Sequence, residues 1–176
     1  MTYGDDPLES VWTTYVTTQS SFKVTKRVSG RKDLSLLSKT NLVPVDGLST
    51  TSLINSARNE LEDLLILAMW AKFERYLIEY IQGVGAVLDT ARPVSLAGNL
   101  HEKFELSVES WKSADVIDLF KDIVDENLRG HAKNIKKYRD YIAHKNPRNE
   151  DAPKTDPATA YRVLSNFILV IRSEAS

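Results

Sequence analysis

The sequence predicts an all-α fold, a helical bundle of about five helices with one long central helix. Apolar residues recur three and four positions apart along most of the chain, and no convincing alternation at period two competes with this pattern. The chain has 176 residues, 42% of them hydrophobic, which is enough for one domain with a core. We expect residues 1–50 to form an N-terminal helix and an irregular segment packed on a helical domain of residues 51–176, all within one domain.

The first expected helix follows Asp6 and Pro7, which are typical of an N-cap and a first helical turn. Apolar residues then recur at helical spacing at Leu8, Val11, Trp12, Tyr15 and Val16. The helix should end near Gly30. The next residues are rich in hydroxyl side chains and are interrupted by proline and glycine, which indicates an irregular connection.

The central helix is expected to begin in the Ser/Thr cluster at residues 49–52 and to run to about Leu88. Its apolar positions include Ile54, Ala57, Leu61, Leu64, Leu65, Ala68, Phe73, Leu77 and Ile81. The stretch 64–71 is apolar around the whole circumference, so more than one of its faces must be covered. We expect the domain core on one side and a second copy of the chain on the other.

Shorter helices are expected at about residues 99–111 and 114–124, followed by a basic helix at about 126–143. A polar loop with several prolines comes next. Asp156 and Pro157 then begin a last helix. Its apolar positions are Tyr161, Leu164, Phe167, Ile168 and Ile171.

Composition narrows the class of protein. The chain has no cysteine, which excludes disulfide scaffolds, thiolate zinc sites and cysteine nucleophiles. Its first residues are acidic rather than basic, unlike a secretory signal, and no apolar run approaches the roughly 20 residues that span a bilayer. We therefore expect a cytoplasmic protein with no membrane association. The net charge of −1 argues neither for nor against nucleic acid.

Most conventional catalytic motifs are absent. The sequence has no Gly-rich phosphate loop, no His-Glu-x-x-His and no Gly-x-Ser-x-Gly. A histidine metal site would need His101, His131 and His144 together from separate segments. A carboxylate site is conceivable, but charges on the wet face of the central helix are the favoured interpretation of Glu60, Glu62, Asp63, Glu74 and Glu79. We therefore expect no metal and no cofactor.

Residues 133–148, in the basic helix and the loop after it, concentrate cations around a single acid, Asp140. Such density suits a polyanion, although cations are also favoured at a helix C-terminus by the helix dipole. Tyr138 and Tyr141 offer rings that could stack on RNA bases or pack in the core. The predicted nucleic-acid-binding residues are Lys133, Lys136, Lys137, Tyr141, Lys145 and Arg148.

Within the stretch YRDYIAHKNP, residues 138–147, Arg139 and His144 form an Arg-x4-His arrangement. In a basic helix late in an all-helical chain, this arrangement resembles the motif of the HEPN superfamily of small all-α proteins. The stretch WAKFERYL, residues 70–77, resembles the family's early long helix, which often has an aromatic residue followed by a Phe-Glu pair. The resemblance covers roughly residues 52–147, and the N-terminal fifty residues show none.

This resemblance implies a metal-independent endoribonuclease of the toxin or antiviral-defence kind. It would act as a homodimer whose two motifs face each other across a shared cleft. Its partners would be RNA, a second copy of the chain and a cognate antitoxin or defence-system protein. The alternative is a HEPN-like module that binds nucleotide or RNA, or acts as a scaffold, without catalysis.

The catalytic interpretation gives each residue a role. His144 would move a proton, and Arg139 would hold the phosphate and stabilise its developing charge. Asp140 would orient the imidazole or pair with Lys136. Glu74 would lie near the motif, as an acid of this helix does in many family members, or remain on a polar helix edge beside Ile78. Attack by the RNA 2′-hydroxyl would leave a cyclic phosphate and spare DNA.

Helix geometry tests this interpretation. On an ideal helix, residues five apart point about 140° away from each other, so Arg139 and His144 do not share a face. A working site would need the helix to unwind before His144, as the proline at position 147 encourages, or a second subunit to cover the outward face.

Overall fold

The structure is a computed structural model that describes residues 6–30, 38, 40–42, 49–144 and 154–174. The regular elements in these residues are all helical: α1 (Glu9–Gly30), α3 (Thr50–Gly85), the 3-10 helix η1 (Ala86–Thr90), α4 (Val94–Val108), α5 (Ser113–Leu119), α6 (Glu126–His144) and α7 (Pro157–Glu174). No strand occurs in the described ranges, and the prediction of an all-α fold is confirmed. None of these helices is long and apolar enough to cross a bilayer.

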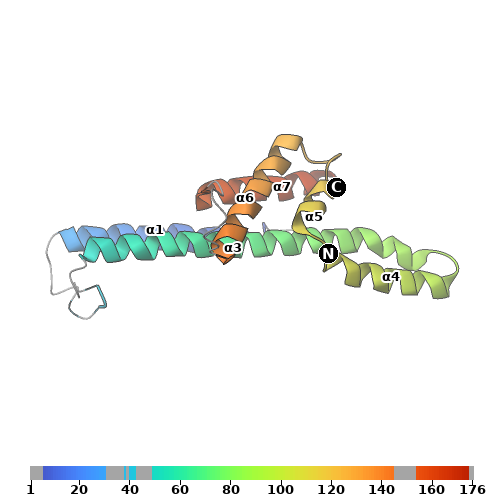
Figure 1. Ribbon diagram of the computed structural model, residues 1–176, viewed down its shortest axis with the longest axis horizontal. Helices are drawn as coiled ribbons and strands as arrows, with labels where there is room; N and C mark the ends of the chain where they lie inside the picture. Colours follow the sequence, from blue (N-terminus) through green and yellow to red (C-terminus); the bar gives the residue numbers. More distant parts are fainter. Residues whose placement is uncertain (1–5, 31–37, 39, 43–48, 145–153, 175–176) are drawn as a thin grey trace.

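The long helix α3 forms the axis of the molecule (Figure 1). Its 36 residues correspond to a rod of about 54 Å. The helix begins after Ser49, whose hydroxyl accepts a hydrogen bond from the Ser52 amide at 3.1 Å. In Figure 1, α1 runs beside one half of this rod, α4 folds back along its other end, and α5, α6 and α7 lie over its middle. The predicted long central helix is therefore confirmed.

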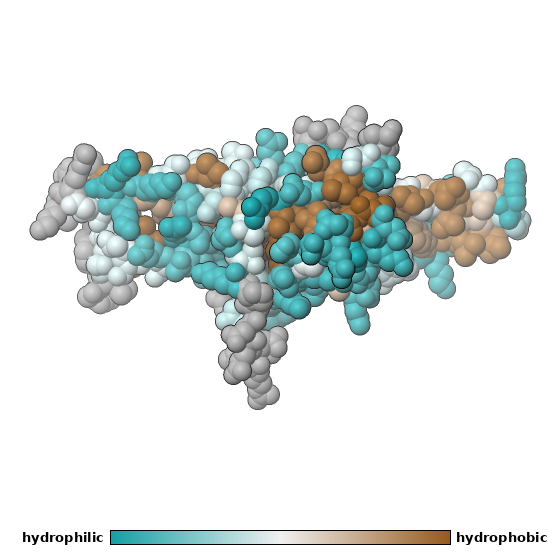
Figure 2. Space-filling model, turned by 90° about the horizontal axis from the view of Figure 1, so that it is seen from above, coloured by the Kyte–Doolittle hydropathy of each residue, from teal (hydrophilic) through white to brown (hydrophobic). Residues whose placement is uncertain are grey.

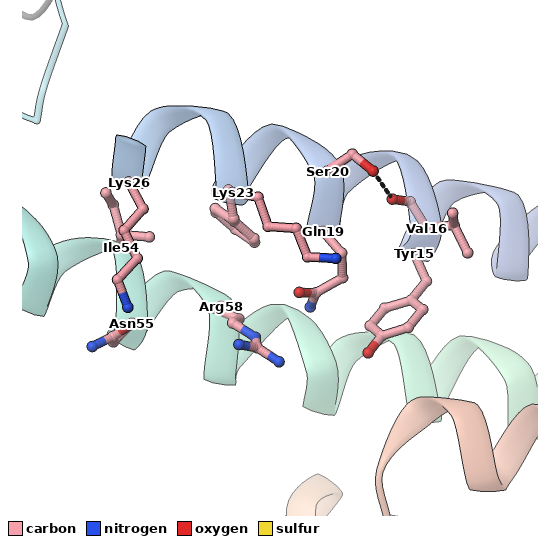
Figure 3. A pocket seen from close by; sticks show the side chains of 10 residues that line it. Tyr15, Val16, Gln19, Ser20, Lys23, Lys26, Ile54, Asn55 and Arg58 are labelled. Carbon is pink, nitrogen blue, oxygen red and sulfur yellow. Dashed lines mark hydrogen bonds between the residues drawn. The ribbon is translucent and has the colours of Figure 1, made fainter. Parts of the chain in front are cut away.

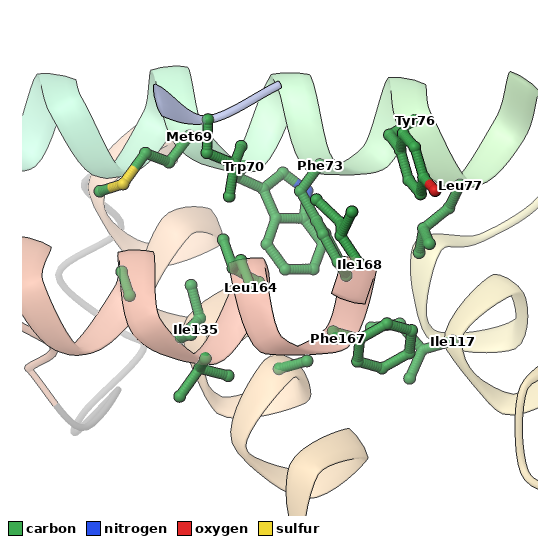
Figure 4. Packing of buried hydrophobic residues seen from close by; sticks show 14 of the residues in the cluster. Met69, Trp70, Phe73, Tyr76, Leu77, Ile117, Ile135, Leu164, Phe167 and Ile168 are labelled. Carbon is green, nitrogen blue, oxygen red and sulfur yellow. The ribbon is translucent and has the colours of Figure 1, made fainter. Parts of the chain in front are cut away.

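The hydrophobic core lies where the middle of α3 meets α1, α5, α6 and α7 (Figure 4). Phe73 packs edge-on against Phe167 of α7, with ring centroids 5.3 Å apart, and Trp70 lies beside Phe73 at 5.4 Å. Full burial of each large apolar side chain contributes about 1.5–3 kcal/mol. The largest fully buried side chains are Trp70, Phe73, Phe167, Leu8, Ile66, Met69, Leu77, Ile117, Ile135, Leu164, Ile168 and Ile171.

The stretch expected to need a partner chain is covered largely by its own chain. Leu65, Ile66, Met69 and Trp70 are buried within the core cluster. Only Leu64, Ala68 and Ala71 are exposed in residues 64–71, and Leu64 is the one large side chain among them, at 53%. The circumference is apolar because helices of one chain pack on several of its sides. This stretch therefore gives no support to the expected homodimer.

Two predicted N-caps fix the ends of the helices that close the core. The Asp6 carboxylate accepts a hydrogen bond from the Leu8 amide at 2.9 Å and another from the Ser165 hydroxyl of α7 at 2.7 Å. Asp156 accepts from both the amide and the hydroxyl of Thr159, at 3.0 and 2.7 Å, and these bonds lower the pKa of its carboxyl. The predicted start of the last helix is confirmed, and the first helix begins at Glu9, two residues after Pro7.

Two shorter helices differ from their expected bounds. Helix α4 begins at Val94 rather than near residue 99, because Pro93 with an extended backbone occupies its N-cap. Helix α5 ends at Leu119 rather than near residue 124, and the chain continues in turns. Asp125 then caps α6 by accepting a hydrogen bond from the Leu128 amide at 3.0 Å.

The end of α3 and the antiparallel α4 form a helical hairpin that projects from the core (Figure 1). Gly85 is buried against Phe104 of α4, and a Cβ atom at this glycine would overlap the aromatic ring. The hairpin also carries apolar surface, visible at one end of Figure 2. Its exposed large apolar residues are Val84, Val87, Val94, Leu96, Leu100 and Leu106.

Candidate active site

Three of the four predicted catalytic side chains meet where α3, α5 and α6 converge. The Arg139 guanidinium donates through Nη2 to Glu74 Oε2 at 3.2 Å and through Nη1 to Asp140 Oδ1 at 3.0 Å. The other carboxylate oxygen of Glu74 accepts a hydrogen bond from the Ser113 hydroxyl, at the start of α5. Glu74 therefore joins the long helix to both of the later ones.

An aromatic face completes the surroundings of Arg139. The guanidinium carbon lies 5.5 Å from the centroid of the Trp70 ring, one turn before Glu74 on α3. Residues four apart share a helix face, which is why Trp70 and Glu74 both reach Arg139. Stacking on an indole and pairing with carboxylates are the interactions that suit a planar guanidinium. The buried indole Nε1 has no hydrogen-bond partner among the described residues.

The cluster is half-buried, and its formal charges balance when Lys136 is included. The side chains of Arg139, Glu74 and Asp140 are 24%, 28% and 32% exposed. Lys136 adds a second cation, with its Nζ 2.6 Å from Asp140 Oδ2. Asp140 thus makes the pair with Lys136 that was the alternative to orienting His144. A phosphate entering this cluster would have to take the place of a carboxylate beside Arg139.

His144 lies apart from this cluster. It is the last residue of α6 and is exposed, and the helix reaches it without a break. Of the two arrangements that would allow a working site, unwinding of the helix before His144 therefore does not occur, and a second subunit is the one that remains. The regular helix keeps His144 about 140° around the axis from Arg139 and about 7.5 Å along it. Within the described residues, His144 makes no hydrogen bond or ion pair.

Acidic residues from other helices neutralise part of the basic helix. Lys133 lies with its Nζ 2.6 Å from both oxygens of Asp118 on α5, and Arg129 binds the same carboxylate at 3.1 Å. The hydrogen bond from Lys133 is the main reason that the pKa of Asp118 is lowered. Of the predicted RNA-binding lysines in the described part of α6, Lys137 alone is exposed and has no ion pair with the described residues.

The two tyrosines of α6 have different environments. Tyr138 is buried and donates its hydroxyl to Asp63 Oδ1 at 2.7 Å. Burial, followed by the contact with Asp63, raises its pKa. Tyr141 is 39% exposed and its ring lies 6.3 Å from that of Tyr138. Tyr141 therefore presents a ring to solvent, whereas Tyr138 belongs to the core. The predicted cations Lys145 and Arg148 lie outside the described residues.

Sequence reasoning missed Trp70 as a neighbour of Arg139 and Ser113 as a neighbour of Glu74. The four-residue spacing between Trp70 and Glu74 gave a usable signal for Trp70. No comparable signal existed for Ser113, which is 39 positions from its partner Glu74.

Two other carboxylates of α3 have protein partners. Glu62 pairs with Arg58 at 2.9 Å, and Asp63 binds Tyr138. No group of three or more histidine, aspartate or glutamate side chains in the described part of the chain is placed to hold a metal ion. In comparisons with known proteins, no family model, no curated protein and no solved structure matches the chain. The HEPN resemblance therefore depends on the two sequence motifs.

Proposed function

We propose that this chain is a cytoplasmic, metal-independent endoribonuclease of the HEPN type, which cleaves RNA through Arg139 and His144 in a cleft shared by two copies. The contact between Glu74 and Arg139 is the observation that supports it most directly. These residues belong to the two stretches that resemble the family, and they are 65 positions apart in the chain. The resemblance implied that they would be neighbours, and the ion pair at 3.2 Å is consistent with that expectation.

In the proposed reaction, Arg139 binds the scissile phosphate in place of one of its carboxylate partners. Its planar donors suit two phosphate oxygens at once and stabilise the charge that develops on them. His144 accepts the proton of the 2′-hydroxyl or gives a proton to the leaving 5′-oxygen. The bond between O2′ and phosphorus forms as the bond between phosphorus and O5′ breaks. The products are a 2′,3′-cyclic phosphate and a 5′-hydroxyl end.

A second copy of the chain belongs to this proposal because of where His144 lies. On a regular α6, Arg139 and His144 point to different sides, so one chain does not present both to one phosphate. A facing copy would bring its own α6 to the outer side of the site. Each shared site would then take Arg139 from one chain and His144 from the other.

A second candidate is a non-catalytic HEPN-like module that binds RNA or nucleotide or acts as a scaffold. It is favoured by the satisfied state of Arg139, which has two carboxylate partners and an aromatic face. In this case the cluster of Arg139, Glu74 and Asp140 has a structural role, the joining of α3 to α6, and no catalytic role.

Incubation of the purified protein with total RNA in EDTA separates the two candidates. We expect the wild-type chain to produce fragments with 5′-hydroxyl ends, and Arg139→Ala and His144→Ala to abolish cleavage with unchanged helical content. Matched controls are Arg162→Ala on α7 and His131→Ala on α6, both at exposed positions, which should cleave like wild type.

Cleavage retained in either the Arg139 or the His144 variant would contradict the endoribonuclease assignment. Strict dependence on magnesium would also contradict it and would point to the carboxylates of α3. RNA binding without cleavage by the wild-type chain would favour the non-catalytic module.

A further inference from the structure

A groove of about 330 Å³ lies between α1 and the first half of α3 (Figure 3). It is separate from the Arg139 cluster, since Arg58 in the groove precedes Glu74 by sixteen residues of α3. This interval corresponds to about 24 Å along the helix and about 160° around it. The groove therefore opens on a different side of the rod and has no role in the function proposed above.

The groove is lined by three cations from two helices. Lys23 and Lys26 extend from α1 and Arg58 from α3, and their charged ends lie in the space between the helices (Figure 3). No carboxylate lines the groove, and neither lysine forms an ion pair with the described residues. Neither lysine belongs to the last turn of α1, where the helix dipole itself would favour a cation.

One carboxylate beside the groove fixes its geometry. Glu62, with a side chain only 14% exposed, accepts hydrogen bonds from Arg58 Nε at 2.9 Å and from Gln19 Nε2 at 3.1 Å. The bond from Gln19 ties α1 to α3, and the bond from Arg58, within α3, sets the direction of the guanidinium. Because Glu62 neutralises one of the three cations, the groove keeps the charge of two lysines for an anionic ligand.

The other lining residues supply flat surfaces and amides. The half-buried rings of Tyr15 and Phe22 and the side-chain amides of Gln19 and Asn55 line the same groove. Aromatic rings stack on nucleobases, and side-chain amides pair with base edges. Cations on flexible stems bind phosphate. A volume of about 330 Å³ is within the range of small-ligand sites.

We propose that the groove between α1 and α3 binds a nucleoside phosphate, either as a free nucleotide or as one nucleotide of an RNA strand. Lys23 and Lys26 bind the phosphate, and Arg58 also contacts it. The base stacks on the ring of Tyr15. The net charge of the chain does not indicate this site, because the site depends on cations that two separate helices bring together.

The test measures binding of two probes in EDTA: ATP by calorimetry, and a short fluorescein-labelled oligouridine by anisotropy. A Lys23→Gln/Lys26→Gln double variant should bind at least one probe more weakly, by roughly tenfold or more, because it removes both charges that bind the phosphate. The matched control replaces two exposed lysines elsewhere, Lys103→Gln on α4 and Lys121→Gln after α5, and should bind like wild type.

Weaker ATP binding by the groove variant identifies a free nucleotide as ligand, and weaker oligouridine binding alone identifies an RNA strand. Either result supports the site. The proposal is overturned if the wild-type chain binds neither probe, if the groove variant binds both as wild type does, or if the control loses as much affinity. Because the substitutions are on the surface, circular dichroism should be unchanged, which shows that a loss of binding does not come from unfolding. RNA cleavage by the same variant reports on Arg139 independently.

Discussion

Arg139 has two carboxylate partners and an aromatic one, yet its ion pairs are weak enough for a phosphate to replace a carboxylate. Its contacts with Glu74 and Asp140 join side chains that are a quarter to a third exposed, and such pairs contribute about 1 kcal/mol or less. A phosphate offers the same guanidinium two charged acceptors in a matching plane. Replacement of a carboxylate by a phosphate is therefore energetically accessible, and the ion pairs are compatible with either proposed function.

Tyr138 gives a prediction about stability at alkaline pH. Its pKa is raised in the folded chain by burial and by Asp63, above the value near 10 of an unfolded tyrosine. Above pH of about 10 the unfolded chain loses this proton while the folded chain keeps it. The contribution of Tyr138 to stability is thus complete below about pH 10 and is lost as pH rises toward the folded pKa.

Tyr138→Phe should lower the free energy of unfolding at pH 7 by about 1–2 kcal/mol, because the Asp63 carboxylate loses its donor. It should also make the decline in stability above pH 10 shallower than in wild type. Urea unfolding across this pH range measures both effects. Tyr141→Phe, at a 39% exposed position, is the control and should change neither. An equally steep decline in the Tyr138 variant would contradict the argument.

Pairs close in sequence were accessible to prediction, and distant pairs were not. Lys136 and Asp140 stand one turn apart on a helix, so their contact followed from spacing alone. The contact between Arg139 and Glu74 was reached only through the resemblance. Asp118 and Asp63 lie 15 and 75 residues from the α6 side chains that they bind, and nothing local marks them as partners. The basic helix therefore looked more cationic in sequence than it is in space.

At the scale of helices, caps decided which bounds were predictable. Asp6, Ser49 and Asp156 carry their hydrogen bonds within a few residues, and the helices that they begin were predicted well. Helix α5 was predicted too long because its apolar pattern continues to Val124 after the helix has ended. Val124 lies in the connection after α5 and is fully buried. Its burial therefore reflects tertiary packing and not helical periodicity.

The hairpin of α3 and α4 depends on the absence of a side chain at Gly85. The position of Gly85 under the Phe104 ring leaves no room for a Cβ atom. Gly85→Ala should destabilise the protein by about 1–3 kcal/mol through overpacking. Gly98→Ala in α4 is the matched control, since a Cβ atom there meets nothing within 4 Å.

The control substitution should stabilise the chain by up to about 1 kcal/mol, because alanine is the better helix former. Thermal unfolding of both variants beside wild type measures the two effects. Equal stability of the Gly85 and Gly98 variants would show that α4 moves away from α3 at little cost.

At the scale of the whole molecule, the homodimer is the main prediction. Light scattering at micromolar concentration should give about twice the 19.9 kDa of one chain. Mixed Arg139→Ala and His144→Ala subunits should partly restore RNA cleavage, because one of the two shared sites then keeps both residues. A mass near that of one chain would contradict the shared cleft. The apolar middle of α3 no longer supports this prediction, which now depends on the position of His144.

The overall arrangement went beyond what periodicity could predict. An amphipathic pattern shows that a helix has a buried face, but not which helix covers it. The sequence therefore predicted the long helix without showing that α1 covers one half of it and α4 the other end. The cations of α1 and α3 became neighbours only through this pairing.

Other helices pack unevenly along α3, which implies that the backbone hydrogen bonds of this one continuous helix open separately in different parts. Its middle, residues 65–78, packs against four other helices, while its first turns lie beside α1 and its last turns beside η1 and α4. Amide hydrogen exchange should therefore be slowest in the middle and faster toward each end, with the two ends exchanging independently of each other. Uniform protection along α3 would instead mean that the rod opens only when the whole protein unfolds. With graded protection, a ligand in the groove would slow exchange at the first half and leave the hairpin unchanged.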